Sequence, residues 1–202
     1  MTFSVTARCL NTGDLGIAIS TAVPAVGNRC IYVKVDVGAI ATQSFTNVML
    51  GTHGIKLLEL GLSPDNAITS LLEEDENKEQ RQVGVIDSLG RAFAWTGTKC
   101  VDWAGHLVGS DHVVAGNMLV SKDTIMVMSA SFQSTSGELS NRLLTALEAG
   151  QNAGGDKRGR VSAALLVASK QAKRYHNLRV DAHSDPVNEL RRIYNLTKKR
   201  YD

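Results

Sequence analysis

The sequence predicts an α+β fold in which two antiparallel sheets lie between outer helical layers, a four-layer α/β/β/α sandwich. The first observation is the order of the expected elements: four strands, two helices, three strands, two helices, two strands and one helix. Paired helices between strand hairpins disfavour a doubly wound parallel sheet, in which single helices alternate with strands. The second observation is that strands such as 37–43 and 161–168 are apolar or small on both faces, so both faces should be covered.

The composition indicates one globular domain, residues 1–202. A chain of 202 residues is too short for two domains of ordinary size, and its 43% hydrophobic content is close to the globular average. The net charge of +2 is too small to favour nucleic acid or an anionic membrane as a partner. No apolar run reaches the length of a membrane-spanning helix, and the first strand is too polar for a signal peptide.

Three cysteines, Cys9, Cys30 and Cys100, are odd in number and lack the spacing of a metal site. Free thiols in a reducing compartment explain them most simply. We therefore expect a soluble, cytoplasmic protein without a cofactor.

The N-terminal hairpin has the clearest pattern. From Thr2 to Arg8 polar and apolar side chains alternate strictly, which is the period of a strand with one polar and one apolar face. Residues 11–14 form a turn in which Gly13 supplies a positive φ, and residues 15–21 return as the second strand.

The other strands are marked by apolar or small residues between turn signals. They are expected at 30–35, 37–43, 82–87, 91–97, 113–119, 161–168 and 178–183. Gly38, Ala39 and Ala41 indicate close approach of another layer or of a ligand. Residues 98–111 are expected to be irregular.

Five helices follow from apolar stripes and end signals. They are expected around 55–60 with an end near Gly61, from Ser63-Pro64, after Ser121, at 138–149 with Gly150 at the end, and from Asp185-Pro186. The serine–proline and aspartate–proline pairs supply a cap residue followed by proline at the first helical position.

Thr2 is the candidate catalytic nucleophile. If Met1 is removed, Thr2 carries both a hydroxyl group and a free α-amine. An α-amine has a pKa of about 7.7–8.0 and can serve as general base near neutral pH. If Met1 is kept, Thr2 is simply the first residue of a strand, and a non-catalytic small-molecule-binding protein is the alternative hypothesis.

Six separated motifs occur along the chain. They are Thr2-Phe3-Ser4, residues 38–47, residues 100–106, Gly116-Asn117, residues 154–160, and residues 178–183 followed by Asp185-Pro186-Val187. In this order they resemble the bacterial domain-of-unknown-function family 1028, which is placed in the N-terminal-nucleophile (Ntn) hydrolase superfamily. The resemblance covers nearly the whole chain. It implies an α/β/β/α sandwich and, by analogy from the fold, cleavage of amide bonds by an N-terminal Thr, Ser or Cys.

On this hypothesis the protein is an amidohydrolase acting on a small amide that carries a carboxylate. Thr2 attacks the carbonyl carbon, while Asn117 and the backbone of Gly116 or Gly155 donate hydrogen bonds to the oxyanion. Arg158 or Arg160 holds the substrate carboxylate by a two-pronged contact.

The glycine-rich basic loop 154–160 has a plainer interpretation as well. Its arginines could bind the carboxylates or carbonyls of the protein itself. In the ligand-pocket interpretation, Gly155 and Asp156 belong to the substrate-binding set together with the two arginines. The loop lacks the Gly-Lys-Ser/Thr ending of a phosphate-binding P-loop.

Thr42, Gln43 and Asn47 lie where a strand of small residues ends and a helix starts. They could line the same pocket, or Thr46 or Asn47 could simply cap the helix. Residues 102–112 and 181–185 contain Asp and His without the tight spacing of a zinc site, so we expect no metal. Exposed strand edges make a homodimer plausible.

Overall fold

Two antiparallel sheets form the framework of the protein in a computed structural model that describes residues 2–198. The strands are β1 (Thr2–Arg8), β2 (Leu15–Thr21), β3 (Ile31–Lys34), β4 (Gly38–Ser44), β5 (Arg81–Asp87), β6 (Ala92–Thr96), β7 (Gly105–Val108), β8 (His112–Asn117), β9 (Ser162–Ala168) and β10 (His176–Val180). The helices are α1 (Val48–Glu59), α2 (Pro64–Glu73), α3 (Asp123–Ser134), α4 (Leu139–Asn152) and α5 (Pro186–Lys198). The predicted α+β class with two antiparallel sheets is confirmed.

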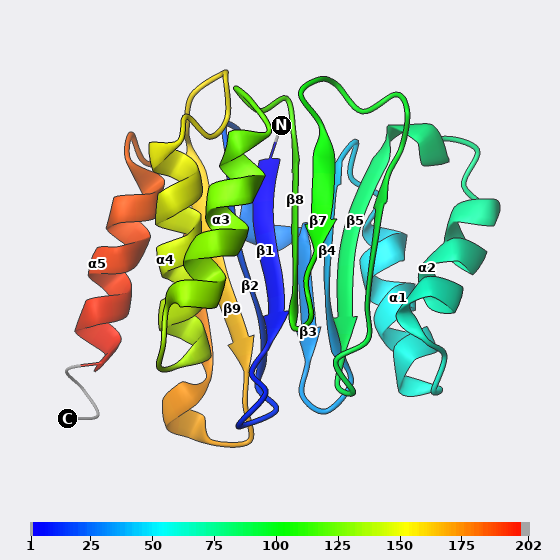
Figure 1. Ribbon diagram of the computed structural model, residues 1–202, viewed down its shortest axis with the longest axis horizontal. Coiled ribbons are helices and arrows are strands. Elements are labelled where there is room, and N and C mark those ends of the chain that lie inside the picture. The colour runs from blue at the N-terminus through cyan, green and yellow to red at the C-terminus, as the bar shows by residue number, and fades with distance from the viewer. Residues whose placement is uncertain (1, 199–202) are drawn as a thin grey trace.

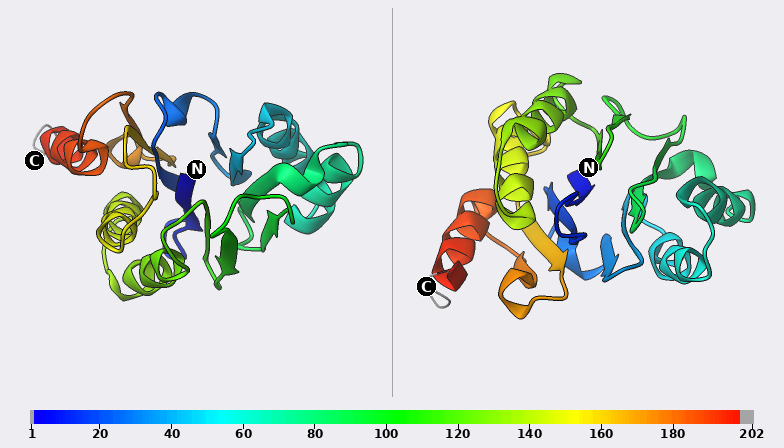
Figure 2. Two further views of the ribbon diagram at one scale, coloured as in Figure 1. Left: turned by 90° about the horizontal axis from the view of Figure 1, so that it is seen from above. Right: turned by 60° about the horizontal axis from the view of Figure 1, so that its bottom comes forward.

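The larger sheet has six strands in the order β10-β9-β2-β1-β8-β7, and the smaller has four in the order β3-β4-β5-β6. Strand β1 lies inside the larger sheet, so its first residue has a neighbour on each side. Thr2 is paired with Thr21 of β2 and with Asn117 of β8. The helices α3, α4 and α5 lie on one side of the strands, and α1 and α2 lie on the opposite side (Figures 1 and 2).

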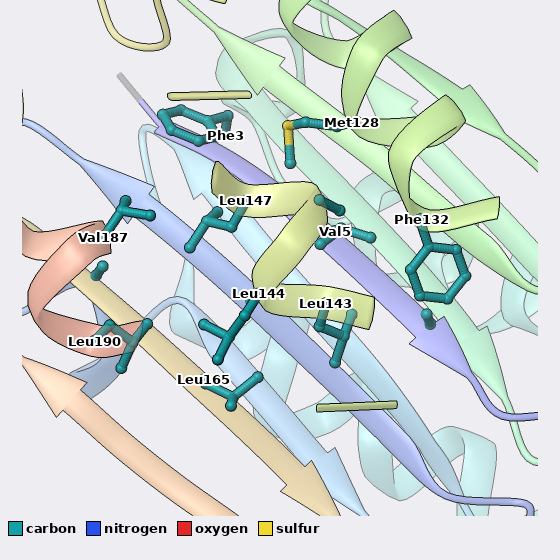
Figure 3. Close-up of a cluster of buried hydrophobic side chains, with 14 of the residues drawn as sticks. Phe3, Val5, Met128, Phe132, Leu143, Leu144, Leu147, Leu165, Val187 and Leu190 are labelled. Atoms are coloured by element: carbon teal, nitrogen blue, oxygen red, sulfur yellow. The ribbon is translucent and has the colours of Figure 1, made fainter. Parts of the chain in front are cut away.

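The main hydrophobic core lies between the larger sheet and its helices. Phe3 and Val5 of β1 contribute to a buried cluster with Leu143 and Leu147 of α4 and with Met128 of α3 (Figure 3). Burial of each such side chain contributes about 1.5–3 kcal/mol. The apolar face of β1 that the alternation predicts is therefore the face toward the helices.

The opposite face of the larger sheet packs against the smaller sheet. Ile17 and Ile19 of β2 share a buried cluster with Ala39 and Ala41 of β4. The small residues of β4 thus meet another layer, as their size predicted. The polar side chains of β1 are buried too, because this face is covered and not solvated. A third cluster joins the outer face of the smaller sheet to α1 and α2.

Three local expectations need correction. The segment 98–111 is not wholly irregular, because β7 forms within it by pairing with β8. Helix α4 does not end at Gly150 but continues to Asn152, and Gly150 packs inside the core against Met128 and Phe3. Leu60, expected on the apolar stripe of the first helix, is exposed.

Within residues 2–198, no helix combines the length and apolar character that crossing a bilayer requires.

Candidate functional site

A pocket of about 210 Å³ opens at the N-terminal end of β1. Segments that are distant in the sequence form its wall. They are Thr2, residues 23–26, Arg29 and Cys30, residues 44–46, Asn117 and Met118, and Arg158. The end of β1 and the loop after α4 lie at the same end of the sheet in Figure 1. Strand β1 lies inside the larger sheet between β2 and β8, and the ends of these two strands lie next to the start of β1. The topology thus brings these segments together.

Thr2 forms part of the pocket wall. It is only 6% exposed, and its Oγ1 donates a hydrogen bond to Thr21 Oγ1 at 3.2 Å. The register explains this contact, since Thr2 and Thr21 are direct partners on neighbouring strands. This hydrogen bond therefore fixes the orientation of the Thr2 hydroxyl group at the pocket.

A buried chain of three side-chain amides lies beside Thr2 and connects the two sheets. Gln43 of β4 donates from Nε2 to Gln82 Oε1 at 2.8 Å, and Asn117 of β8 donates from Nδ2 to the same oxygen at 2.9 Å. The Gln82 Nε2 in turn donates to the carbonyls of Gly116 at 2.8 Å and Gly105 at 3.1 Å. Buried polar groups need such partners, so this chain fixes all three amides.

The loop after α4 presents Arg158 to the pocket. The buried carboxylate of Asp156 accepts hydrogen bonds from the Arg158 backbone N–H at 2.8 Å and from Ala22 N–H at 3.0 Å, and it lies 3.4 Å from the Arg158 guanidinium. Gly155 adopts a positive φ of 53°, and an added Cβ would lie 3.1 Å from the Phe3 ring. Gly155 and Asp156 thus support Arg158 and do not themselves line the pocket.

The pocket is positively charged. Arg29 and Arg158 line it, and no acidic residue does among the described residues on its wall. The Arg158 side chain is 41% exposed. An anionic group is therefore the ligand chemistry that this wall favours.

Cys30 is the one thiol on the described pocket wall. Burial raises the pKa of Cys30, while a 3.7 Å contact with Thr46 Oγ1 and the nearby Arg29 act in the opposite direction. Its sulfur therefore stays protonated near neutral pH, and a thiol is a poor nucleophile. Thr2 is the stronger candidate for a reacting group.

A family model described as "Family of unknown function (DUF1028)" matches residues 2–190. The chain belongs to this family. The solved crystal structure of protein SPO2555 from Silicibacter pomeroyi, assigned to the same family, is similar to this chain with a TM-score of 0.90 and 29% sequence identity. That similarity covers 96% of this chain and 88% of the other.

Anbu (ancestral beta-subunit) from Yersinia bercovieri is a much more distant structural neighbour. It has a TM-score of 0.45 and 10% identity, with 96% of this chain and 93% of that chain covered. No curated protein matches this chain.

Four of the six motifs that carry the family resemblance contribute to the pocket. Thr2 comes from the first, Ser44 to Thr46 from the second, Asn117 from the fourth and Arg158 from the fifth. The sequence thus predicted Thr2, Asn117 and Arg158 as site residues, and the structure brings these three together.

Three other residues that were predicted to bind substrate contact other parts of the protein. Arg160 pairs with Asp185 at 3.2 Å, which matches the interpretation that a loop arginine binds a carboxylate of the protein itself. Thr42 Oγ1 donates to the Asn47 carbonyl at 3.2 Å. Asn47 caps α1 by accepting from Met49 N–H at 3.0 Å, so the helix-cap alternative describes its position.

Asn47 also donates to Asp75 at 2.7 Å. Hydrogen bonds from Arg81, ahead of those from Asn47 and the Asn77 backbone, lower the pKa of Asp75 to about 2. These bonds thus tie the segment between α2 and β5 to the start of β5.

Sequence reasoning missed Gln82 and Arg29. Gln82 was visible as a long polar side chain at the start of a buried strand, but its partners lie on four other strands, β4, β6, β7 and β8, which belong to both sheets. Arg29 lies in a loop whose position relative to Thr2 depends on the packing of the whole domain.

The groups of Asp and His side chains do not converge on a cation. Within residues 2–198 no set of three or more His, Cys, Asp or Glu side chains could hold a metal ion. His112 instead contacts Ser129 Oγ through Nε2 at 2.8 Å and Asp111 through Nδ1 at 3.2 Å. These atoms have the order of a Ser–His–Asp triad, but His112 is fully buried and burial lowers its pKa.

Proposed function

We propose that this protein is an amide hydrolase of the N-terminal-nucleophile type, acting on a small substrate that carries a carboxylate. The observation that carries the proposal is the position of Thr2 on the wall of a pocket with two arginines and no acidic residue among the described ones. The family resemblance supports the same reaction by analogy with the superfamily.

In the proposed reaction the Thr2 hydroxyl attacks the amide carbonyl carbon, and the α-amine of Thr2 takes the hydroxyl proton. Collapse of the tetrahedral intermediate breaks the C–N bond, the proton goes to the leaving amine, and the acyl group stays on Thr2 Oγ1 as an ester. Water then attacks this ester and passes a proton through the α-amine to Thr2 Oγ1, which breaks the ester bond and releases the acid. Removal of Met1, which lies outside the described residues, is required for this mechanism.

The substrate is small. A volume of about 210 Å³ is below the roughly 300–1,000 Å³ of pockets that hold drug-sized ligands. Arg158, with Arg29 beside it, would bind the carboxylate by charge-assisted hydrogen bonds. An N-acyl amino acid has both the amide and the carboxylate, and short acyl chains fit the volume best.

The proposal also covers the fold class and the cellular location of the protein. Helices outside two packed sheets support an α/β/β/α sandwich of the Ntn type. Three buried cysteines that are free of disulfides support a cytoplasmic location. The homodimer stays a prediction, which sedimentation of the purified protein tests.

A non-catalytic binding protein on the same fold is the second candidate. The observation in its favour is that the two arginines offer an anion site whether or not the α-amine of Thr2 is free. On this alternative, Thr2→Ala leaves ligand binding intact and the wild-type protein hydrolyses nothing.

The deciding experiment uses protein whose N-terminal residue is Thr2, verified by intact mass, against a panel of short N-acyl amino acids. We expect hydrolysis by this protein, partial activity in Thr2→Ser and none in Thr2→Ala. The matched control carries one additional residue before Thr2, which blocks the α-amine and should abolish activity. Absence of hydrolysis together with retained binding of the same compounds would establish the binding protein instead.

A further inference from the structure

The orientation of the buried amide chain can be read from two backbone carbonyls. The oxygens of Gly105 and Gly116 can only accept hydrogen bonds, and both lie within 3.1 Å of one end of the Gln82 amide. That end must therefore be the NH₂ group. The carbonyl oxygen Oε1 of Gln82 must point the other way, toward Gln43 and Asn117.

The orientation of Gln82 then determines that of Asn117. Because Gln82 Oε1 can only accept, Asn117 must turn its nitrogen Nδ2 toward it, at 2.9 Å. The Oδ1 of Asn117 is consequently directed away from Gln82. It is buried and has no hydrogen-bond partner among residues 2–198. A buried acceptor without a partner indicates that a donor belongs there, and Asn117 lies on the pocket wall.

We infer that Gln82 is a positioning residue, which holds Asn117 Oδ1 as the hydrogen-bond acceptor for the α-amine of Thr2. This inference rests on the proposed function, because the amine exists only after Met1 is removed. Asn117 is the direct partner of Thr2 across the β1–β8 pair, and such neighbours place their Cβ atoms about 4.5–5.5 Å apart. An amide oxygen at that position can accept a hydrogen from the amine and leave the amine's lone pair for the Thr2 hydroxyl.

The same inference adds a role to the one first expected for Asn117. One hydrogen of its Nδ2 is donated to Gln82, so we assign Oδ1 to the amine, and the second Nδ2 hydrogen stays available to an oxyanion. The charged groups on the described wall are Arg29 and Arg158, with the carboxylate of Asp156 behind Arg158. Two nearby cations lower the pKa of an amine, which leaves a neutral acceptor such as Asn117 to orient it.

The test measures the pKa of the Thr2 α-amine directly, by NMR titration of ¹⁵N-threonine-labelled protein with Thr2 at its N-terminus. We expect Asn117→Leu to lower this pKa by about 1, because the protonated amine loses its acceptor. Asn117→Asp should raise it, because a carboxylate is a stronger acceptor for a cation. Gln82→Met frees the Asn117 amide to turn and should lower the pKa in the same direction as Asn117→Leu.

The matched control is Thr96→Val. Thr96 Oγ1 also accepts from Gln82 Nε2, at 3.0 Å, but both glycine carbonyls remain to orient the amide. The pKa should therefore match that of the wild type. An unchanged pKa in folded Asn117→Leu would overturn the acceptor role, and an unchanged pKa in folded Gln82→Met would overturn the positioning role.

Folding of each variant is checked by thermal unfolding. If Gln82→Met does not fold, the opposite shifts of Asn117→Asp and Asn117→Leu still decide the acceptor role, and Gln82→Asn decides the positioning role. Asparagine keeps an uncharged amide but is one methylene shorter, so its oxygen is withdrawn from Asn117 Nδ2 and the amine pKa should fall as in Asn117→Leu. Because the readout is an amine pKa, the inference can hold even if no amide is hydrolysed, which separates its failure from that of the proposed function.

Discussion

Asp156 accepts a hydrogen bond from the backbone N–H of Ala22 at 3.0 Å, and so ties the basic loop after α4 to the end of β2. The same carboxylate oxygen lies 3.4 Å from the guanidinium of Arg158. One buried side chain thus fixes both the loop and the arginine that faces the pocket.

Replacement of Asp156 by alanine should destabilise the protein and weaken anion binding together. The change leaves the N–H of Ala22 without its acceptor, and loss of a buried partner costs about 1–3 kcal/mol. Urea unfolding of Asp156→Ala measures the loss. Asp181→Ala is the control, because Asp181 and Arg179 form an exposed pair worth roughly 0–1 kcal/mol at most. Equal stability of the two variants would contradict the role of Asp156.

Arg29 and Arg158 should matter for an anionic ligand, whereas Arg160 should not. Arg29→Ala and Arg158→Ala each remove one of the two pocket cations, and we expect KM or Kd for N-acyl amino acids to rise about tenfold or more. Arg158→Lys keeps the charge but loses the two-pronged geometry, so it should restore only part of the affinity.

The control for this series is Arg160→Ala. Arg160 pairs with Asp185 and does not line the pocket, so its removal should leave the affinity within about twofold of the wild type. Calorimetric titration of the Thr2→Ala protein separates binding from any reaction. Equal losses in Arg158→Ala and Arg160→Ala would argue against the pocket as the anion site.

Stability should fall as the pH drops below about 6.5. Burial lowers the pKa of His112 and His176, so the unfolded chain binds protons at a pH where the folded protein does not. This stability is fully present above the unfolded pKa of about 6.5 and is lost as the pH falls toward the lower folded values.

Each histidine contributes a slope of at most about 1.4 kcal/mol per pH unit within that window. Urea midpoints between pH 8 and pH 5 measure the effect. His112→Gln should flatten the curve, because glutamine does not titrate there. A profile that is flat in the wild type over this range would refute the prediction.

Gly150→Ala should destabilise the protein although alanine is the better helix former. An added Cβ would lie 2.6 Å from Sδ and 2.7 Å from Cγ of the fully buried Met128. Overpacking of this kind costs about 1–3 kcal/mol, against a gain of about 1 kcal/mol in helix propensity.

A second-site change distinguishes packing from propensity. Met128→Ala alone opens space in the core, and Gly150→Ala should be less harmful in that background than in the wild type. Thermal unfolding of the four proteins in this double-mutant cycle gives the coupling. Strict additivity would show that Met128 is not the obstacle.

Local signals predicted much of the fold. The alternation from Thr2 to Arg8 and the turn at Gly13 gave the first hairpin its bounds, and the prolines Pro64 and Pro186 marked the starts of two helices. These signals lie within a few residues of the element that they define. Strand β7 was missed because it is short, half exposed and formed only through its pairing with β8.

The site was predictable to the extent that it follows from strand ends and loops. Thr2, Asn117 and Arg158 were predicted from a strand start and two motif positions, and all three line the pocket. Gln82 and Arg29 were not, because their roles depend on how two sheets pack and on where a loop crosses. Gly150 resembled a helix end until the packing of Met128 was known.

The amide chain has a mechanical consequence for the pocket. Gln43 and Gln82 belong to the smaller sheet, and Asn117 belongs to the larger. A slip of one sheet over the other by a single residue, about 3.3 Å, would break the Asn117–Gln82 bond and the bonds from Gln82 to Gly105 and Gly116. The chain of amide hydrogen bonds therefore holds the two sheets in one register. We expect the pocket to keep the same shape before and after a ligand binds.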